Sequence, residues 1–277
     1  MTLREALTLG IRRLTEAGIE GAARDARALL AETVGIDASR VTLEGDMVLT
    51  RPEAFDAMIV RRISGEPVSK ILGRRQFWGR EFAVTRDTLD PRPETETLIA
   101  AALELGPVET IADLGTGSGI IAVTLLAEWP GARATATDIS EAAMDVALSN
   151  AGTLGVRRRM TSILSDGVWF PEGIGAFEMI LSNPPYITED EMAELSREVR
   201  EHDPEIALTP GGDGLDPYRE IAGGVRDHLV SGGHVLVELG WKQGPDVASL
   251  FEDAGLEEVR VLSDLDGRDR VVVGRNP

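Results

Sequence analysis

The sequence predicts an α/β fold, in which a small N-terminal helical bundle precedes a seven-stranded, mostly parallel, doubly wound sheet. Apolar residues recur at helical spacing through the first 65 residues. Beyond residue 108, strand-like and helical segments alternate, and a glycine-rich turn follows the first of these strands. Such alternation is typical of an open parallel sheet with helices on both faces.

Composition indicates a globular protein of the cytoplasm. Of the 277 residues, 43% are hydrophobic, which is enough for a core. The chain has no cysteine, which excludes disulfides, thiolate metal sites and cysteine nucleophiles and is compatible with a reducing compartment. The longest near-apolar run, Ile120 to Ala127, is far shorter than the roughly 20 residues of a membrane helix. The charged N-terminal stretch lacks a secretory apolar region, so no membrane partner is expected.

The first 74 residues are expected to form the helical domain. Leu3, Leu7, Ile11 and Leu14 share one helical face. Further amphipathic segments run from residue 22 to 34 and from Pro52 to about residue 63.

Short β-like pieces between residues 65 and 84 predict a hairpin that joins the two domains. Glycines at 73 and 79 separate these pieces, which are Ile71-Leu72, Gln76-Phe77-Trp78 and Phe82-Ala83-Val84. The expected division is therefore a helical domain at 1–74, a hairpin or linker at 75–90 and a catalytic domain at 91–277.

The larger domain is expected to contain seven strands. They are Thr110–Leu114, Ala132–Thr137, Met160–Leu164, Phe177–Ser182, His234–Leu239, Glu257–Leu262 and Asp269–Val273. The predicted helices are Thr97–Leu105, Ile120–Glu128, Glu141–Ala151, Tyr218–Leu229 and Gln243–Ala254. No helix separates the last two strands, so they should pair antiparallel at the edge of the sheet.

The turn after the first strand is a candidate cofactor site. It reads Asp113-Leu-Gly-Thr-Gly-Ser-Gly119, with glycines at alternate positions where a ligand must approach the backbone. Residue 120 is Ile, so the third glycine comes one position too early for a dinucleotide fingerprint. The pattern instead resembles the S-adenosylmethionine loop of class I methyltransferases, which implies that Asp113 faces the charged methionine end, directly or through water. The alternative is a tight turn that uses glycine for geometry alone.

Acidic residues after the next two strands are candidates for further cofactor contacts. Asp138 ends the second strand and is placed to accept hydrogen bonds from both ribose hydroxyls; its alternative role is the N-cap of the following helix. After the third strand, Asp166 could bond the adenine amino group and Trp169 could pack on the ring. The alternatives are an ordinary Asp-Gly turn and an ordinary core tryptophan.

The segment after the fourth strand indicates the chemistry. It reads Asn183-Pro184-Pro185-Tyr186, and two prolines leave nearby carbonyl oxygens facing a cleft. The Asn183 side-chain oxygen and the Pro184 carbonyl can together accept both hydrogens of a planar NH₂ group, and Tyr186 can cover its flat face. This arrangement suits methyl transfer to a weakly nucleophilic amide or aromatic amine. The alternative is a Pro-Pro loop that only ends a strand.

Several motifs together resemble the bacterial release-factor glutamine methyltransferases over essentially the whole chain. Besides Asn183 to Tyr186, they are Gly65-Glu-Pro67, Gln76-Phe-Trp-Gly79, Pro91-Arg-Pro-Glu-Thr-Glu96, Glu205-Ile-Ala-Leu208, Gly211-Gly-Asp-Gly-Leu215 and Tyr218-Arg219. The resemblance implies a Rossmann-like class I methyltransferase that acts in translation termination. It would methylate the side-chain amide nitrogen, N5, of the glutamine in the Gly-Gly-Gln motif of class 1 peptide chain release factors.

The resemblance also assigns roles to residues. The donor would be S-adenosylmethionine, which leaves as S-adenosylhomocysteine, and the glutamine would be held by Asn183, Pro184, Pro185 and Tyr186, with Asn183, Pro184 and Tyr186 catalytic. The cofactor-binding residues would be Asp113, Gly115, Thr116, Gly117, Ser118, Gly119, Asp138, Asp166, Trp169 and Asn183. The three histidines are not at metal-ligand spacing, so no metal is expected. Family members often carry an aromatic directly after the third-strand Asp, whereas Gly167 and Val168 intervene here, so the aromatic that stacks on adenine stays open.

Two other functions share some of these features. Asn-Pro-Pro-Tyr also occurs in DNA and RNA methyltransferases that act on adenine N6 or guanine N2. Residues 1–80 carry a net charge of +2 and residues 81–277 carry −21, and a surface this acidic repels a phosphate backbone, so no direct nucleic-acid target is expected. The acidity has an alternative explanation in solubility.

A noncatalytic S-adenosylmethionine-binding module would explain the glycines but not residues 183–186. A basic group is a candidate docking surface for the release factor: Arg61, Arg62, Lys70, Arg74, Arg75 and Arg80.

Overall fold

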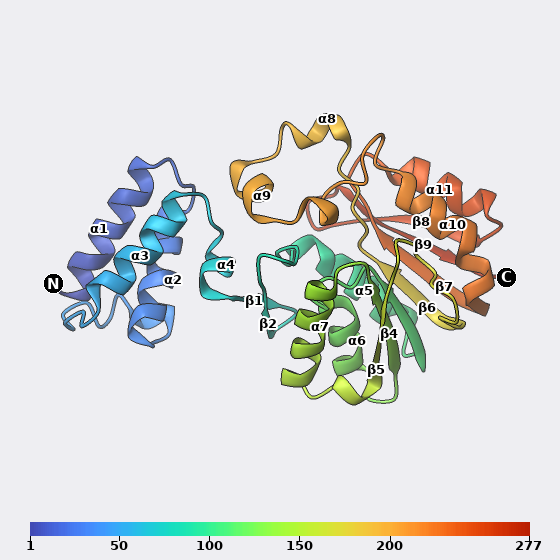
Figure 1. The fold of residues 1–277 in the computed structure, drawn as a ribbon, viewed down its shortest axis with the longest axis horizontal. Helices are drawn as coiled ribbons and strands as arrows, with labels where there is room; N and C mark the ends of the chain where they lie inside the picture. The colour runs from blue at the N-terminus through green and yellow to red at the C-terminus, as the bar shows by residue number, and fades with distance from the viewer. The chain divides into compact units, whose positions relative to one another are not determined.

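The computed structural model describes residues 1–277, and these form two compact units. The first unit is Met1–Arg74 together with Ser196–His202. The second is Arg75–Leu195 together with Asp203–Pro277, so residues 75–90 group with the larger unit (Figure 1).

The first unit is helical. Its elements are α1 (Leu3–Glu16), α2 (Ala22–Val34), the 3₁₀ turn η1 (Ala38–Arg40), α3 (Pro52–Ile63), α4 (Val68–Leu72) and α9 (Arg197–His202). Thr2 and Glu5 form a capping box that starts α1, and Gly35 ends α2 in the left-handed conformation. The apolar faces meet in one core that includes Leu14, Leu29 and Ile59. The prediction of a strand-like piece at Ile71-Leu72 is wrong: these residues end α4, a short helix that starts after Pro67 and stops at Gly73.

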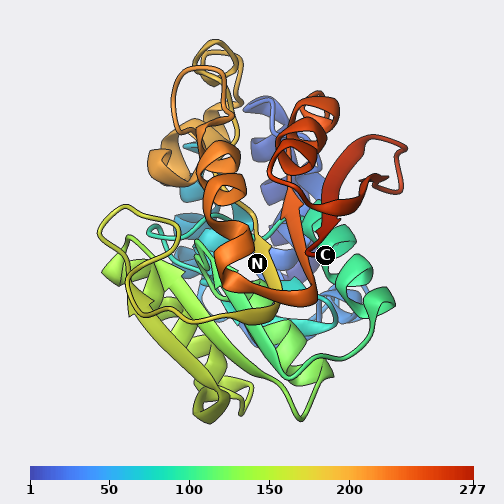
Figure 2. The same ribbon diagram turned by 90° about the vertical axis from the view of Figure 1, so that its right-hand side faces the viewer.

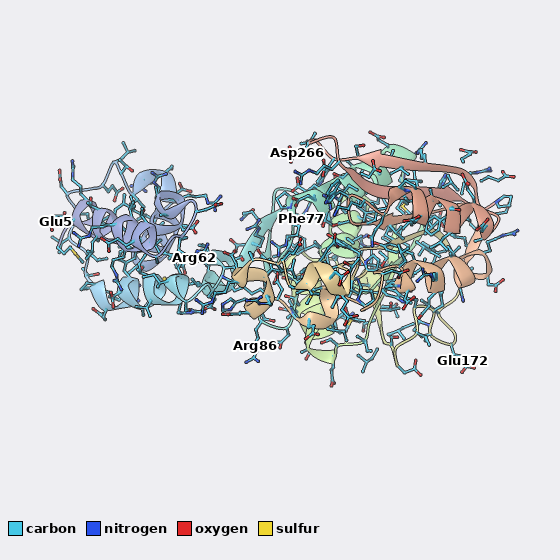
Figure 3. The ribbon with its side chains drawn as sticks, turned by 90° about the horizontal axis from the view of Figure 1, so that it is seen from above. Glu5, Arg62, Phe77, Arg86, Glu172 and Asp266 are labelled. Atoms are coloured by element: carbon cyan, nitrogen blue, oxygen red, sulfur yellow. The ribbon has the colours of Figure 1, made fainter.

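A buried guanidinium ties the elements of the first unit together. The Arg62 side chain, on α3, is 7% exposed and is labelled in Figure 3. Its Nε lies 2.8 Å from a carboxylate oxygen of Asp25 on α2, and its Nη2 lies 2.9 Å from Glu198 on α9. Asp25 is also buried, and its other cationic partner, Arg24, is exposed, so loss of Arg62 would remove the only buried positive charge beside this carboxylate.

A short hairpin opens the second unit. Strands β1 (Arg74–Phe77) and β2 (Arg80–Ala83) form a two-stranded sheet joined by Trp78 and Gly79. Both linking residues have positive φ, 48° and 67°, as a type I′ turn requires. Phe77 and Phe82 pack edge to face on opposite strands and join the core of the larger unit. The hairpin expected in this part of the sequence is thus present.

The second unit contains the predicted seven-stranded sheet. Its strands are β3 (Thr110–Leu114), β4 (Arg133–Asp138), β5 (Met160–Leu164), β6 (Phe177–Ser182), β7 (Leu229–Glu238), β8 (Glu257–Ser263) and β9 (Asp269–Arg275). Their order is β5-β4-β3-β6-β7-β9-β8. All neighbours pair parallel except β9, which lies between β7 and β8 and is antiparallel to both. The expected antiparallel pair at one edge is therefore confirmed.

Helices cover both faces of this sheet (Figures 1 and 2). They are α5 (Glu96–Leu105), α6 (Ile120–Glu128), α7 (Glu141–Thr153), α10 (Asp216–His228) and α11 (Gly244–Asp253). Side chains alternate between the faces along each strand. Val271 and Val273 join the core formed with α5, α6 and α7, whereas Val272 joins the core formed with α10 and α11.

Shorter elements complete the second unit. They are the 3₁₀ turns η2 (Pro93–Thr95), η3 (Arg157–Arg159) and η4 (Glu205–Ala207), and the short helix α8 (Glu189–Met192). None of the helices in either unit is both long and apolar enough to cross a lipid bilayer.

The strand order places several loops at one end of the sheet. Strand β3 lies between β4 and β6, and its last residue, Leu114, is in register with Thr137 on β4 and Ser182 on β6. The chain runs from β3 to β4 in one direction and reaches β6 on the other side, so the order reverses at β3. Ligands of open α/β sheets bind outside the carboxyl ends of the strands at this kind of switch point.

One buried amide joins the hairpin to the glycine-rich turn. Asn150, on α7, is 2% exposed. Its Oδ1 accepts from the Ala83 backbone N–H at 2.7 Å, and its Nδ2 donates to the carbonyls of Ala83 at 3.0 Å and Ser118 at 2.8 Å. The side chain therefore fixes the end of β2 against the turn that follows β3.

Replacing Asn150 by alanine is expected to lower the free energy of unfolding by about 3 kcal/mol, because three backbone groups, at Ala83 and Ser118, lose their side-chain partner. Urea denaturation measures this change. Ser149→Ala, at the exposed neighbouring position on the same helix, is the matched control and should change stability by less than about 0.5 kcal/mol. Equal effects of the two substitutions would contradict the bridging role of Asn150.

Candidate active site

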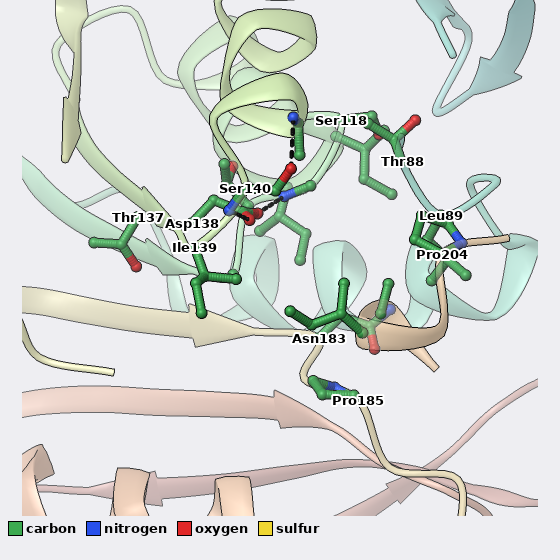
Figure 4. Close-up of a pocket in the computed structure, with 18 of the residues that line it drawn as sticks. Thr88, Leu89, Ser118, Thr137, Asp138, Ile139, Ser140, Asn183, Pro185 and Pro204 are labelled. Atoms are coloured by element: carbon green, nitrogen blue, oxygen red, sulfur yellow. Dashed lines mark hydrogen bonds between the residues drawn. The ribbon is translucent and has the colours of Figure 1, made fainter. Parts of the chain in front are cut away.

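A cavity of about 240 Å³ opens at the carboxyl ends of the central strands. Its walls come from the loops after β3, β4, β5 and β6 and from residues 87–95 and 204–207 of the second unit. Figure 4 shows Ser118 and Asp138 on the walls of this cavity together with Asn183 and Pro185. The candidate cofactor loop and the candidate substrate motif therefore share one cavity.

The glycine-rich turn needs its glycines for both conformation and space. Gly115, Gly117 and Gly119 all have positive φ, between 55° and 82°. A Cβ on Gly119 would lie 3.0 Å from the Cβ of Ala147, so α6 could not pack this closely against α7. Residues 115–118 line the cavity, and Gly119 closes the turn behind them at the start of α6.

Asp113 lies beneath the turn and does not line the cavity. One of its carboxylate oxygens accepts from the Thr116 hydroxyl at 2.7 Å and from the Ala122 backbone N–H at 3.1 Å. Its other oxygen is buried without a hydrogen-bond partner. Burial raises the pKa of Asp113 to about 6. The carboxylate therefore stabilises the conformation of the glycine-rich turn through hydrogen bonds on its buried side.

Asp138 combines a place on the cavity wall with a support role. Its Oδ2 accepts from the Gly117 backbone N–H at 2.8 Å, and its Oδ1 accepts from the Ser140 N–H at 2.9 Å. Burial raises the pKa of this carboxyl. The alternative that Asp138 is the N-cap of the next helix is wrong, because α7 is capped by Ser140, whose hydroxyl accepts from the Ala143 N–H. Each Asp138 oxygen retains capacity to accept from a ligand.

The loop after β5 supplies apolar wall. Trp169 lines the cavity, and its ring packs close to Gly115, where a Cβ would come 3.3 Å from it. Val168 and Ile139 also line the cavity and are each 48% exposed. Asp166 is exposed and lies off the cavity wall. Of the two candidates in this loop, the structure brings only the tryptophan to the cavity.

The Asn-Pro-Pro-Tyr corner follows β6 directly. The Ser182 hydroxyl donates to the Leu114 carbonyl at 2.7 Å, which fixes the start of the corner against β3. Asn183 and Pro185 line the cavity, and Pro184 is buried. Tyr186 is partly buried and packs against the core formed with α10 and α11; its burial raises the pKa of the phenol, so the ring stays neutral.

Gln243 fixes the end of the Asn-Pro-Pro-Tyr corner through the Tyr186 backbone. The sequence did not indicate this role. Its Nε2 donates to the Tyr186 carbonyl at 3.0 Å and to the Gly214 carbonyl at 3.5 Å, and its Oε1 accepts from the Gly240 N–H at 3.0 Å. The side chain is 9% exposed. It therefore connects the segments after β6 and β7 with the glycine-rich loop at 211–214.

Another buried carboxylate fixes the cavity wall formed by residues 204–207. Asp203 accepts from the Asp90 backbone N–H at 3.2 Å and from the Arg92 guanidinium at 2.7 Å. Arg92 lines the cavity. Asp203 precedes the wall residues 204–207, so this pair joins two segments that lie over a hundred residues apart.

The basic group at residues 61–80 is not an open cationic surface. Arg61 pairs with Glu66 and Arg62 with Asp25 and Glu198. Arg74 pairs with Glu32, Arg75 with Asp90 and Arg80 with Glu128. These guanidinium groups are neutralised by carboxylates of the same chain, so the expectation that they dock a partner is not supported by their environment.

Sequence comparison places the chain in a family. A family model for the PrmC N-terminal domain matches residues 5–73, and one for the Methyltransferase small domain matches residues 85–213. The chain is 55% identical over 280 residues to the release factor glutamine methyltransferase of Cereibacter sphaeroides, covering 100% of this chain and 99% of the relative. This chain belongs to the release factor glutamine methyltransferase family. The family member of Rhodospirillum rubrum is 44% identical over 99% of this chain and 85% of its own length.

Solved structures agree on the fold. The crystal structure of a methyltransferase from Pyrococcus furiosus aligns with a TM-score of 0.55 at 17% identity, covering 79% of this chain and 96% of its own. The seven-stranded sheet therefore has the fold of that structure, and the enzyme, as a member of a methyltransferase family, takes its methyl group from S-adenosylmethionine. The cavity suits that donor: the start of α6, the Asp138 carboxylate and the Trp169 indole line the same space, and a helix N-terminus offers backbone N–H groups to a ligand.

Proposed function

We propose that this enzyme methylates the side-chain amide nitrogen of the glutamine in the Gly-Gly-Gln motif of class 1 release factors. The observation that carries the proposal is the placement of Asn183 and Pro185 on the wall of the same cavity as Gly117 and Asp138. The full-length similarity to release factor glutamine methyltransferases supports the choice of substrate.

The corner at 183–186 holds the acceptor amide. The Asn183 Oδ1 and the Pro184 carbonyl accept the two hydrogens of the glutamine NH₂ group, while Tyr186 covers the face of the amide. Two acceptors orient the nitrogen lone pair and raise its electron density as the new N–C bond forms. Since proline has no N–H, the corner presents no backbone donor at 184 and 185 that would compete for the amide oxygen.

When bound, S-adenosylmethionine supplies a methyl group activated by a sulfonium sulfur. The chain's part is to align this group: the turn at 115–119 receives the methionine end, Asp138 accepts from the ribose hydroxyls, and Trp169 packs on the adenine. Asp113 acts from below the turn through Thr116 and the start of α6. The amide nitrogen needs no general base while the bond forms, because its proton leaves after the nitrogen becomes cationic.

Radiolabelled S-adenosylmethionine with purified release factor tests this function. Label should enter the release factor and should not enter a variant in which the motif glutamine is alanine. Bulk RNA and DNA serve as competitors and as substrates in separate arms. Label in nucleic acid, or label in the glutamine-to-alanine variant at the wild-type rate, would reject the proposal.

Asp138→Ala is expected to weaken S-adenosylmethionine binding about 10-fold or more, because two hydrogen bonds to a charged acceptor are lost. Isothermal titration calorimetry measures the change. Asp145→Ala removes the same charge from an exposed position on α7 and should leave the Kd unchanged. An unchanged Kd for Asp138→Ala would show that this carboxylate serves only the Gly117 and Ser140 backbone groups.

We also propose that the helical first unit docks the release factor. The segment at residues 41–48 carries strongly exposed apolar side chains: Leu43 is 84% exposed and Val48 is 63% exposed. Met47 in the same segment is 38% exposed as well, and contiguous exposed apolar surface, unlike a single exposed side chain, marks interaction sites. Release factors act in translation, so the proposed site of action is the cytoplasm.

Leu43→Asp is expected to raise the KM for release factor about 10-fold while kcat stays the same, because the side chain would be buried only in the complex. Steady-state kinetics measures both. Leu265→Asp, at a fully exposed leucine of the second unit, is the matched control and should leave the KM unchanged. A KM that is the same for both variants and the wild type would place docking elsewhere.

A further inference from the structure

A carboxylate is buried beneath the Asn-Pro-Pro-Tyr corner. Glu238 ends β7 after three residues that are fully buried and apolar, and it is itself only 1% exposed. Its Oε2 has no hydrogen-bond partner. Burying a carboxyl at this depth costs free energy, so its presence calls for a compensating role.

Glu238 belongs to a hydrogen-bonded group of three side chains. Interactions with the Thr95 and Asn183 side chains lower the pKa of its carboxyl and so act against the effect of burial. In addition, Asn183 Nδ2 lies 3.3 Å from the hydroxyl oxygen of Thr95, to which it donates. Thr95 is fully buried at the end of η2, and because its hydroxyl accepts from the asparagine, its own hydrogen is available to an acceptor such as the carboxylate.

These contacts determine which way the Asn183 amide faces. A carboxylate can only accept, and so the hydrogens on Nδ2 are directed toward Glu238 and Thr95. No group of the protein donates to Asn183 Oδ1, and Asn183 lines the cavity. Rotation of the amide by 180° would instead present its NH₂ group to the cavity, where a substrate NH₂ group could not bond to it.

We propose that Glu238 is a positioning residue that holds the Asn183 amide with Oδ1 toward the acceptor nitrogen, with Thr95 as the second contact. The inference about the amide's orientation comes from this chain alone. Only its consequence for catalysis rests on the proposed function, because it takes glutamine as the group that Asn183 holds.

The surroundings of Glu238 make its charge sensitive to pH near neutrality. Burial raises its pKa to about 7; the Arg270 guanidinium on β9 opposes this effect, and Glu94 on η2 adds to it. The Tyr218 hydroxyl donates to the Glu238 backbone carbonyl at 2.9 Å, and burial keeps this phenol and that of Tyr186 neutral. Once protonated, the carboxyl can donate a hydrogen bond and no longer requires the NH₂ group of Asn183.

Selective ¹⁵N labelling of asparagine tests the orientation without any substrate. The chain has only three asparagines, at 150, 183 and 276, so three side-chain NH₂ signals are expected and a single substitution assigns each. The Asn183 signal should titrate with a midpoint near pH 7 in the wild type and should not titrate in Glu238→Gln. The signal of Asn150 serves as the internal control, since its partners are backbone groups.

Kinetics tests the consequence. Glu238→Gln is expected to lower kcat 10- to 100-fold with less than a threefold change in the KM for release factor or the Kd for S-adenosylmethionine. The wild-type kcat should fall below pH 7, and this acid limb should be absent in the variant. Thr95→Val should lower kcat in the same way, and Thr95→Ser, which restores the hydroxyl, should recover most of it. Melting temperatures of all variants separate these effects from loss of fold.

The outcomes discriminate between the two proposals. An Asn183 signal that does not titrate in the wild type, or a Glu238→Gln enzyme with wild-type kcat and pH profile, would overturn the role of Glu238. If the wild type transfers no methyl group to release factor while the Asn183 signal titrates as expected, the substrate assignment fails and the positioning role stands.

Discussion

Replacing Asn183 by alanine is expected to lower kcat for release-factor methylation about 100-fold. The variant loses one of two acceptors that hold the glutamine amide, and removal of one preorganised hydrogen-bonding group from a reacting centre typically costs this much. The KM should change less, because most contacts with a protein substrate lie outside the corner. Single-turnover measurements with labelled S-adenosylmethionine report the methyl-transfer step directly.

The fold should survive this substitution, since Asn183 is a partly exposed residue on a cavity wall. Its loss does, however, leave Thr95 and Glu238 without their shared partner, so the melting temperature is measured alongside. Wild-type turnover in a folded Asn183→Ala enzyme would refute the role given to the corner.

Gly214→Ala is expected to lower kcat/KM about 100-fold because it would displace the backbone of the Asn-Pro-Pro-Tyr corner. A Cβ at Gly214 would overlap the Tyr186 carbonyl oxygen and would lie 2.9 Å from Gln243 Nε2. The backbone after Pro185 must then shift, and a displacement of about 1 Å at a reacting centre can cost 100-fold.

Gly211→Ala is the matched control, in the same loop and with a similar backbone conformation. Gly211 and Gly214 have φ of 83° and 75°, so alanine carries a comparable conformational cost of about 1–2 kcal/mol at each. An added Cβ at Gly211 meets nothing within 4 Å. Equal losses of kcat/KM in the two variants would show that backbone strain, rather than the steric overlap with Tyr186, causes the loss.

Local patterns were sufficient to predict most of the fold. A continuous apolar run such as that of β9 marks a strand buried on both faces, and the glycines at 115, 117 and 119 mark a strand-to-helix turn that a ligand can approach. Because the carboxyl ends of parallel strands share one edge of a sheet, these patterns also predicted that the loops after β3, β4 and β6 meet.

Contacts between distant segments were beyond such patterns. Ile71-Leu72 has the composition of a strand, but Pro67 and Gly73 make a short helix favourable there. Gln243 carries no local signal, since its role depends on the Tyr186 and Gly214 carbonyls. Glu238 does carry a signal that could have been used: a single acidic residue closes an otherwise apolar, buried strand.

The Asn150 bridge has a consequence for how the enzyme matures. Its amide holds Ala83 and Ser118 at once, so the methyl-donor loop reaches its final shape only after three stretches spread over nearly seventy residues have assembled. A chain emerging from the ribosome should therefore gain affinity for the donor late, once α7 has left the exit tunnel and folded against the sheet.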